Sequence, residues 1–370
     1  MFVEMLRQRG VPGALRVAEM KLHEKARVMW RDEGLEFGRL EVEDDGKLHG
    51  ISYNTKVAKG KAPIVCLHGY GTGSGIWCTS LPVLSVRLPE RAIHALDTLG
   101  CGLSSREEEW SKTASGVEAE EMVVDALDVW REKKGYDEIV LVGHSIGAVF
   151  ATAYAEKFPG RVSTLVLASP AGVAKGVAPP KEEKSDEKPS SFNAYFRQQV
   201  KRWVLTAWRR GLFDPLSTVQ CFPSLGRRAI HSYVARRFSE KNAWTRRLKP
   251  ELEDYLFENA LGGPVSLGGA LLTLLLVPLK PSAGLRPLED RLIQPHFLPG
   301  KQLAFIYGQR DWMPHAPADH VRSLRETNLG RTTPVLFVDD GASHNLMVDN
   351  PIGFADAIIS LLDGTYDDLR

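Results

Sequence analysis

Several features that mark common classes of protein are scarce in this sequence. The 370 residues contain only four cysteines, and none of them forms a C-x-x-C pair (Cys66, Cys78, Cys101 and Cys221). We therefore expect neither a zinc site nor a disulfide framework, and we predict no other metal site. Cysteine use of this kind is simplest to explain by a reducing compartment.

Long apolar runs are also missing. The run from Val265 to Leu279 is too short to cross a bilayer as one helix, and it suits either a buried helix lining an acyl pocket or a helix in the membrane interface. The segment from Met1 to Met20 has no uninterrupted apolar core and no small-residue cleavage site, so we expect no secretory signal. We predict an intracellular, cytoplasmic protein with peripheral membrane association. A mitochondrial location stays open because Arg7, Arg9 and Arg16 are compatible with a weak presequence.

Neither sign of charge dominates the whole chain. Lysine and arginine number 47 against 46 aspartates and glutamates, a formal net charge of +1. This balance argues against a protein that binds nucleic acid through a generally basic surface, so we expect no nucleic-acid partner.

Short apolar runs alternate with amphipathic stretches from residue 61 onward. Six of these runs are predicted strands: Ile64 to Leu67, Ala92 to Leu96, Ile139 to Val142, Leu165 to Leu167, Leu303 to Tyr307 and Val335 to Val338. Helices are predicted over Val117 to Lys133 and Ile146 to Phe158, and a hairpin over Leu40 to Tyr53 turning at Asp45 and Gly46. The pattern predicts an α/β fold in which helices flank a mostly parallel central sheet.

The alternation breaks between about Val173 and Gly300. A polar run over residues 179–191 is typical of a flexible linker, and helical, basic, aromatic-rich sequence follows it. We therefore expect residues 1–172 and 301–370 to form one α/β core, with a helical cap inserted over residues 173–300.

The strongest local signal is the pentapeptide Gly143-His144-Ser145-Ile146-Gly147, a G-x-S-x-G between a predicted strand and a predicted helix. A serine on such a sharp turn is exposed to a substrate, and the flanking glycines relieve the crowding of the strained turn. Ser145 is therefore the candidate nucleophile.

A base and an orienting acid are expected later in the chain. Asp311 follows the strand that ends at Tyr307, and His344 follows the last predicted strand. Carboxyl ends of parallel strands meet at one edge of a sheet, so these residues can converge on Ser145. His315 and His320 are the competing bases, and the competing acids are Asp319, Asp339 and Asp340.

Two backbone N–H groups are candidates for an oxyanion hole. One belongs to Ile146, at the start of the helix after Ser145, and the other to Tyr70, between Gly69 and Gly71 in the loop after the first predicted parallel strand. This glycine-rich loop lacks the Lys-Ser/Thr ending of a P-loop, so we do not expect a nucleotide there.

Together these motifs resemble the α/β-hydrolase fold family. The shared pattern includes Leu67-His68-Gly69-Tyr70-Gly71, Asp97 with Gly100, Gly102 and Ser104, the Ser145 turn, Phe158-Pro159-Gly160-Arg161-Val162, Asp311-Trp312 and His344-Asn345-Leu346-Met347-Val348-Asp349. The resemblance is closest to a lipid-acting group that includes N-acylphosphatidylethanolamine lipase, the lipase coactivator of lipid droplets and mitochondrial cardiolipin-specific phospholipase. It implies an α/β-hydrolase fold and a serine lipase or phospholipase that needs no cofactor.

Two alternatives to hydrolysis remain. His344 and Asp349 resemble an H-x-x-x-x-D motif proposed for lysophosphatidic acid acyltransfer, which would require acyl-CoA, although Asp349 also merely precedes Asn350, a suitable cap for the last helix. The chain could instead be a non-enzymatic adaptor that recruits a lipase; the coactivator in the resembled group lacks the nucleophilic serine that this chain has at position 145.

The predicted cap is strongly basic. Residues 197–249 contain ten arginines and three lysines against one aspartate and one glutamate, a net charge of +11, which leaves −10 on the remaining residues. We expect Arg209, Arg210, Arg236 and Arg237 to contact a membrane or a lipid headgroup, because arginine binds phosphate in a forked geometry. The sequence thus predicts hydrolysis of an acyl ester of an anionic glycerophospholipid at an anionic membrane surface.

Overall fold

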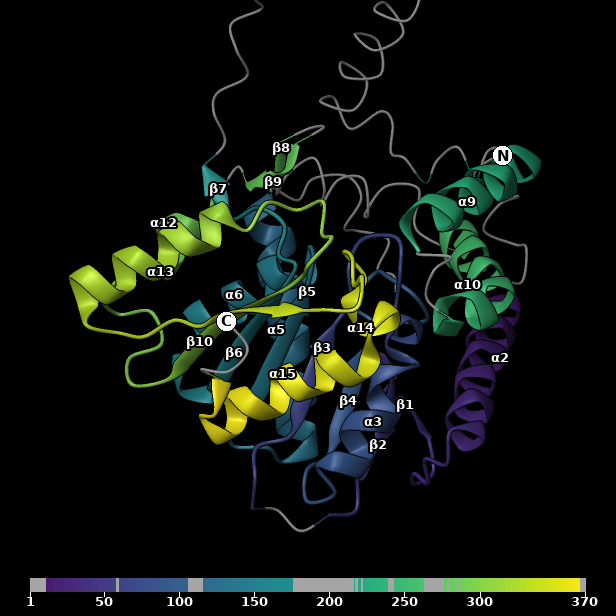
Figure 1. Cartoon of the computed structure of the whole chain (residues 1–370), viewed down its shortest axis with the longest axis horizontal. Helices are drawn as coiled ribbons and strands as arrows, with labels where there is room; N and C mark the ends of the chain where they lie inside the picture. The colour runs from purple at the N-terminus through teal and green to yellow at the C-terminus, as the bar shows by residue number, and fades with distance from the viewer. Residues whose placement is uncertain are drawn as a thin grey trace, which may run out of the picture.

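A computed structural model describes residues 11–57, 60–105, 116–175, 216, 219–220, 222–238, 243–262, 276–277, 280–284 and 286–366 (Figure 1). Its centre is an eight-stranded sheet of order β1-β2-β4-β3-β5-β6-β10-β11. The strands are β1 (Glu41–Asp44), β2 (His49–Tyr53), β3 (Ile64–Leu67), β4 (Ile93–Leu96), β5 (Ile139–His144), β6 (Val162–Ala168), β10 (Gln302–Gly308) and β11 (Val335–Val338). The pairs β1–β2 and β2–β4 are antiparallel, and all other neighbours are parallel.

The six predicted parallel strands and the hairpin are confirmed. Gly46, with a φ of 84°, provides the left-handed conformation that the turn between β1 and β2 requires. The central strands are apolar without alternation because both faces of the sheet are covered.

Helices cover each face of this sheet. One core packs α5 (Gly116–Lys134), α6 (Gly147–Lys157), α12 (Leu288–Leu292) and α13 (Ala316–Leu329) on the first face. The other packs α2 (Val11–Asp32), α3 (Ser80–Arg87), α14 (Leu346–Asp349) and α15 (Pro351–Asp363) on the second. The predicted helices over 117–133 and 146–158 are confirmed as α5 and α6, and Asn350 caps α15 by accepting a hydrogen bond from the Gly353 amide at 2.8 Å.

Two longer helices, α9 (Pro223–Arg237) and α10 (Ala243–Gly262), lie between β6 and β10 in the sequence. Figure 1 shows them at one side of the sheet, with α10 alongside α2. The rings of Trp30 in α2 and Trp244 in α10 stack with centroids 3.8 Å apart, and Arg247 pairs with Asp32 at 2.6 Å. Helix α2 therefore supports the helices of this later segment.

A second small sheet also lies in this segment, formed by β7 (Ala174–Lys175), β9 (Lys280–Gly284) and β8 (Leu276–Val277). The expectation of a helix over the apolar run to Leu279 is wrong at Leu276 and Val277, which form a strand; residues 263–275 and the predicted linker at 179–191 lie outside the described residues. Within the described part of the chain, no helix combines the length and the apolar character needed to cross a membrane.

Candidate active site

Ser145 lies in the tight turn between β5 and α6 and has a φ of 54°, a conformation rare for residues other than glycine. The flanking glycines make this turn possible by close packing. A Cβ atom on Gly143 would lie 2.5 Å from the Gly147 carbonyl oxygen, and one on Gly147 would lie 2.6 Å from the Leu67 and His68 carbonyl oxygens. Larger residues would therefore push α6 away from β3 and β5.

The structure brings the three residues of the predicted triad together. His344 Nε2 lies 3.2 Å from Ser145 Oγ, and His344 Nδ1 lies 3.1 Å from Asp311 Oδ1. Asp311 also accepts a hydrogen bond from the Met313 amide at 2.9 Å. Burial is the largest single influence and would raise the pKa of the Asp311 carboxyl. The hydrogen bond with His344, the attraction between the two groups and the Met313 amide act together against it and hold this pKa below its ordinary value. Asp311 is therefore ionised at neutral pH.

The competing candidates lie elsewhere. His315 pairs with Asp319 at 2.7 Å and His320 with Glu289 at 3.4 Å, and the imidazoles of both histidines are more than half exposed. The Asp339 backbone carbonyl accepts from the Ala342 amide in the loop before His344, and Asp340 in the same loop has a φ of 55°. The acid in contact with His344 is Asp311.

No sequence pattern indicated a role for His144, the residue directly before Ser145. Its Nε2 donates to the His344 backbone carbonyl at 2.8 Å, and the two imidazole rings lie 4.9 Å apart. Burial lowers the pKa of His144 to about 3, so the ring is neutral and its one proton is on Nε2. His144 thus fixes the backbone that carries His344 without adding a charge beside it.

The glycine loop after β3 lies directly beside Ser145. A Cβ on Gly69 would be 3.1 Å from the Ser145 Cβ. The Thr98 amide donates to His68 Nε2, so His68 Nδ1 carries the proton and donates to the Gly69 carbonyl at 2.7 Å; Thr72 Oγ1 donates to the same carbonyl at 3.0 Å. A trans peptide directs its N–H opposite to its carbonyl, so the Tyr70 N–H points away from these donors. Gly71, with a φ of 71°, continues the loop.

Asp349 is fully buried beneath the loop that carries His344. Its Oδ2 accepts from the Ser343 amide at 2.9 Å and from Ser343 Oγ at 2.5 Å. Burial raises the pKa of Asp349 above its ordinary value despite these hydrogen bonds. The expectation that Asp349 merely precedes the cap of α15 is therefore incomplete, because this carboxyl also holds the residue before His344.

Of the four arginines predicted to contact lipid, Arg209 and Arg210 lie outside the described residues. Arg236 and Arg237 are exposed in the last turn of α9. Arg236 Nε donates to the Ser232 carbonyl of its own helix at 3.1 Å. The Arg237 guanidinium instead lies over the ring of Trp312, 4.7 Å from its centroid.

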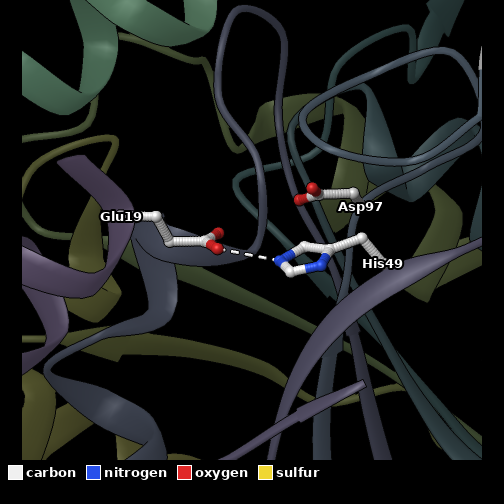
Figure 2. Close-up of side chains that lie close together, drawn as sticks. All are labelled: Glu19, His49 and Asp97. Atoms are coloured by element: carbon white, nitrogen blue, oxygen red, sulfur yellow. Dashed lines mark hydrogen bonds and ion pairs between the residues drawn. The ribbon is translucent and has the colours of Figure 1, made fainter. Parts of the chain in front are cut away.

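One buried cluster has residue types that can hold a metal ion: Glu19 of α2, His49 of β2 and Asp97 after β4 (Figure 2). Each carboxylate oxygen already accepts a hydrogen bond: Glu19 from His49 and Ser74 Oγ, each at 2.8 Å, and Asp97 from the Ser74 and Leu103 amides at 2.5 and 2.7 Å. These donors satisfy the carboxylates without an ion, so the cluster serves to join α2 to the loops behind the site.

Residues 62–249 match the alpha/beta hydrolase fold family. Among curated proteins, the chain is 29% identical over 329 residues to the abhydrolase domain-containing protein abhd-5.2 of Caenorhabditis elegans, covering 85% of this chain and 62% of that protein. It is 39% identical over 112 residues to the human (lyso)-N-acylphosphatidylethanolamine lipase, covering 30% of this chain and 31% of the lipase. It is 27% identical over 315 residues to a 1-acylglycerol-3-phosphate O-acyltransferase of Arabidopsis thaliana, covering 84% of this chain and 68% of that enzyme. The chain thus spans less than two thirds of the first two relatives.

Among solved structures, the fold resembles a membrane phospholipase A described as a bacterial virulence factor, with a TM-score of 0.58, 20% sequence identity, and coverage of 96% of this chain and 94% of that one. An esterase from Thermogutta terrifontis matches with a TM-score of 0.52 and 19% identity over 89% of this chain and 99% of the esterase. At these identities the structural comparison bears on the fold.

Proposed function

Because the chain belongs to the alpha/beta hydrolase fold family, we propose that it is a serine hydrolase in which Ser145 is the nucleophile, His344 the base and Asp311 the orienting acid. The observation that carries this proposal is the continuous set of contacts from Ser145 Oγ through the His344 imidazole to Asp311 Oδ1. The three groups come from loops after β5, β11 and β10, at the carboxyl ends of parallel strands of one sheet.

In the proposed reaction, Ser145 Oγ attacks the ester carbonyl while its proton moves to His344 Nε2. Asp311 accepts a hydrogen bond from Nδ1, which keeps Nε2 free to act as the base and stabilises the imidazolium. The protonated Nε2 then donates its proton to the departing alkoxide, and an acyl-enzyme remains. In the second half of the reaction, His344 removes a proton from a water molecule, and this water attacks the acyl-enzyme ester. Ser145 Oγ then takes the proton back from His344 as the fatty acid leaves.

The negative oxygen of the tetrahedral intermediate needs two donors. Ile146 is the N-cap residue of α6, at the end of the helix where the first amides have no acceptor within the helix and the helix dipole favours an anion. The Tyr70 amide belongs to the loop that lies against Ser145 and has its preceding carbonyl held by His68 and Thr72. We assign the oxyanion hole to these two N–H groups.

The proposed substrate is an acyl ester of a glycerophospholipid, with an anionic lipid preferred. The names of the similar curated proteins refer to an N-acylphosphatidylethanolamine and to an acylglycerol phosphate, both phosphate-bearing lipids with acyl chains. The arginines of α9, a helix without a single acidic residue, support an anionic preference. We further propose that the protein works while bound peripherally at an anionic membrane surface.

The first test is Ser145→Ala in purified protein. Hydrolysis of a mixed phospholipid extract, followed by mass spectrometry of the released fatty acids, is expected to fall at least about a thousandfold because no other hydroxyl contacts His344 among the described residues. The same substitution is expected to abolish labelling by a fluorophosphonate probe. Ser163→Ala, which removes a half-buried hydroxyl bonded to the Ile139 carbonyl, is the matched control.

Hydrolysis that survives Ser145→Ala would refute this mechanism. A wild-type protein that neither reacts with the fluorophosphonate nor hydrolyses phospholipid would instead favour the adaptor alternative. Transfer of a labelled acyl chain from acyl-CoA to lysophosphatidic acid, without hydrolysis, would favour the acyltransferase.

A further inference from the structure

We infer that Arg237 binds the phosphate group of the substrate directly beside the catalytic pair, and thereby selects phosphate-bearing esters over neutral ones. This inference rests on the proposed hydrolase function and adds a specificity residue to it. It separates Arg237 from the other described arginines of α9 by its position and its packing.

The backbone of Arg237 is tied to the loop that carries His344. Ser343 Oγ lies 3.1 Å from the Arg237 carbonyl oxygen and 2.5 Å from Asp349 Oδ2. The last turn of α9 therefore touches the residue that immediately precedes the proposed base. The contact with Ser343 therefore fixes the position of the Arg237 backbone relative to His344.

The side chain of Arg237 lies over the ring of Trp312, which in turn lies beside His344. Its guanidinium carbon lies 4.7 Å from the centroid of the Trp312 ring, and the Trp312 ring lies 4.8 Å from the His344 imidazole. Taken together, the two contacts put the guanidinium within about 10 Å of the imidazole. The phosphate of a glycerophospholipid is only a few bonds from its ester carbonyls, so one lipid can reach both groups.

Stacking leaves the binding capacity of the guanidinium intact. A cation over an aromatic ring uses the face of the guanidinium plane, while its N–H donors point outward along the edge. Two parallel N–H donors match two oxygens of a phosphate, a geometry that lysine lacks. Trp312 thus restricts the orientation of Arg237 before substrate binds, which lowers the entropy that binding must overcome.

Some neighbouring arginines form ion pairs with carboxylates, whereas Arg237 forms none with any residue that the structure describes. Arg227 pairs with Asp254 at 2.7 Å, and Arg247 pairs with Asp32. Arg236 donates to the carbonyl of Ser232. The positive charge closest to the Ser145–His344 pair on α9 is therefore also one that no described carboxylate balances.

The test compares two monomeric short-chain substrates that differ only in the phosphate: dibutyryl phosphatidic acid and dibutyryl glycerol. We expect Arg237→Gln to lower the ratio of kcat/KM for the phosphatidic acid to kcat/KM for the glycerol ester by about tenfold to a hundredfold. Arg237→Lys should give an intermediate ratio because it keeps the charge and loses the fork. Arg39→Gln removes the same charge from an exposed arginine before β1, outside the basic segment, and should leave the ratio at its wild-type value.

A second measurement needs no turnover. Titration calorimetry with dibutyryl phosphatidic acid should show binding to the Ser145→Ala protein and at least about tenfold weaker binding when Arg237→Gln is added. Inorganic phosphate distinguishes the source of the phosphate. Weaker binding of inorganic phosphate than of dibutyryl phosphatidic acid to the Ser145→Ala protein, at constant ionic strength, places the bound group on the lipid. Equal or tighter binding of inorganic phosphate overturns the lipid assignment in favour of a free anion.

An unchanged ratio in Arg237→Gln, with hydrolysis still dependent on Ser145, would refute the role of Arg237 and leave the proposed function standing. An equal fall of the ratio in Arg39→Gln and Arg237→Gln would show that only overall charge matters and would also refute it. If wild-type protein hydrolyses neither ester, the proposed function fails, and this inference with it.

Discussion

At the scale of single residues, the geometry of the site depends on two glycines that lack side chains as well as on Ser145 itself. Ser145 takes a left-handed backbone conformation, and the bare Cα atoms of Gly143 and Gly147 let α6, β3 and β5 approach it. The hydroxyl is thereby held at the end of β5 with only 9% of the residue exposed. The position of the Ser145 hydroxyl therefore depends on how closely α6, β3 and β5 pack around the turn.

Gly147→Ala tests this packing. The new methyl group would lie 2.6 Å from two backbone carbonyl oxygens of the β3 end, so we expect a loss of about 1–3 kcal/mol in the free energy of unfolding and a large fall in kcat. Urea denaturation and ester hydrolysis measure the two effects. Gly160→Ala is the control, since a Cβ there meets nothing within 4 Å, and its unfolding free energy should change by less than about 0.5 kcal/mol.

Asp349→Asn tests whether Asp349 holds the loop that carries His344 or belongs to an acyltransferase motif. An amide keeps the shape of the carboxyl but loses the charge-assisted hydrogen bonds with Ser343, so the loop carrying His344 should loosen. We expect the free energy of unfolding to fall by about 1–3 kcal/mol and hydrolysis to fall with it. Loss of acyl transfer to lysophosphatidic acid with hydrolysis and stability intact would contradict this view and support the acyltransferase motif.

Residue identity alone predicts only part of this site. Ser145, Asp311 and His344 can be proposed from their order along the chain, because each follows a strand whose end lies at one edge of the sheet. His144 and Ser343 cannot, because their contacts, with the His344 carbonyl and with Asp349, arise from the folded path of loops far apart in the sequence. No local pattern distinguishes such histidines and serines from others in the chain.

At the scale of elements, α2 shows why the sequence pattern can fail to predict a helix. Its buried side includes Glu19 and His23 among apolar residues, while Val17, Met20 and Val28 are exposed on the other side. The apolar stripe that identifies an amphipathic helix is therefore blurred on both faces. By contrast, β3 and residues Ile139 to Val142 of β5 are fully buried, and each forms a continuous apolar run in the sequence.

His23 in α2 gives a pH-dependent prediction. Burial lowers its pKa from 6.5 to about 3, and its ring nitrogens have no hydrogen-bond partner among the described residues. Between these pH values the unfolded chain binds a proton that the folded chain excludes, so stability is full above pH 6.5 and falls as the pH drops.

His23→Leu removes that proton linkage. Relative to wild type, the variant should gain about 2 kcal/mol in unfolding free energy when the pH is lowered from 7 to 5. Chemical denaturation at the two pH values measures the gain, with His320→Leu as the control for an exposed imidazole. A difference that stays constant between pH 7 and pH 5 would show that His23 is protonated in the folded protein.

At the scale of the whole molecule, the net charge of +1 conceals a separation. The basic segment that contains α9 carries +11, and the remaining residues carry −10. On α9 the arginines lie near exposed apolar side chains, with Phe222 at 61% and Leu225 at 55% exposure. Apolar groups beside positive charge suit the boundary of an anionic bilayer.

Binding to vesicles tests this separation. Co-sedimentation with vesicles containing phosphatidylglycerol should weaken by about tenfold or more when salt is raised from about 0.05 M to 0.5 M, because the charges are exposed and screened. Phe222→Ser combined with Leu225→Ser should weaken binding at low salt as well. Equal binding to vesicles of neutral phosphatidylcholine, unaffected by salt, would contradict an electrostatic contribution.

The packing of α10 on α2 has a consequence for how this protein can be divided. The family match ends at residue 249, inside α10, and omits α2 together with the strands that precede Asp311 and His344. A shortened protein cut at that boundary would hold Ser145 without His344, its proposed base. One that starts after Asp32 would lack Trp30, against which Trp244 packs. For expression, fusion or domain transplantation, the smallest useful unit therefore runs from α2 through α15.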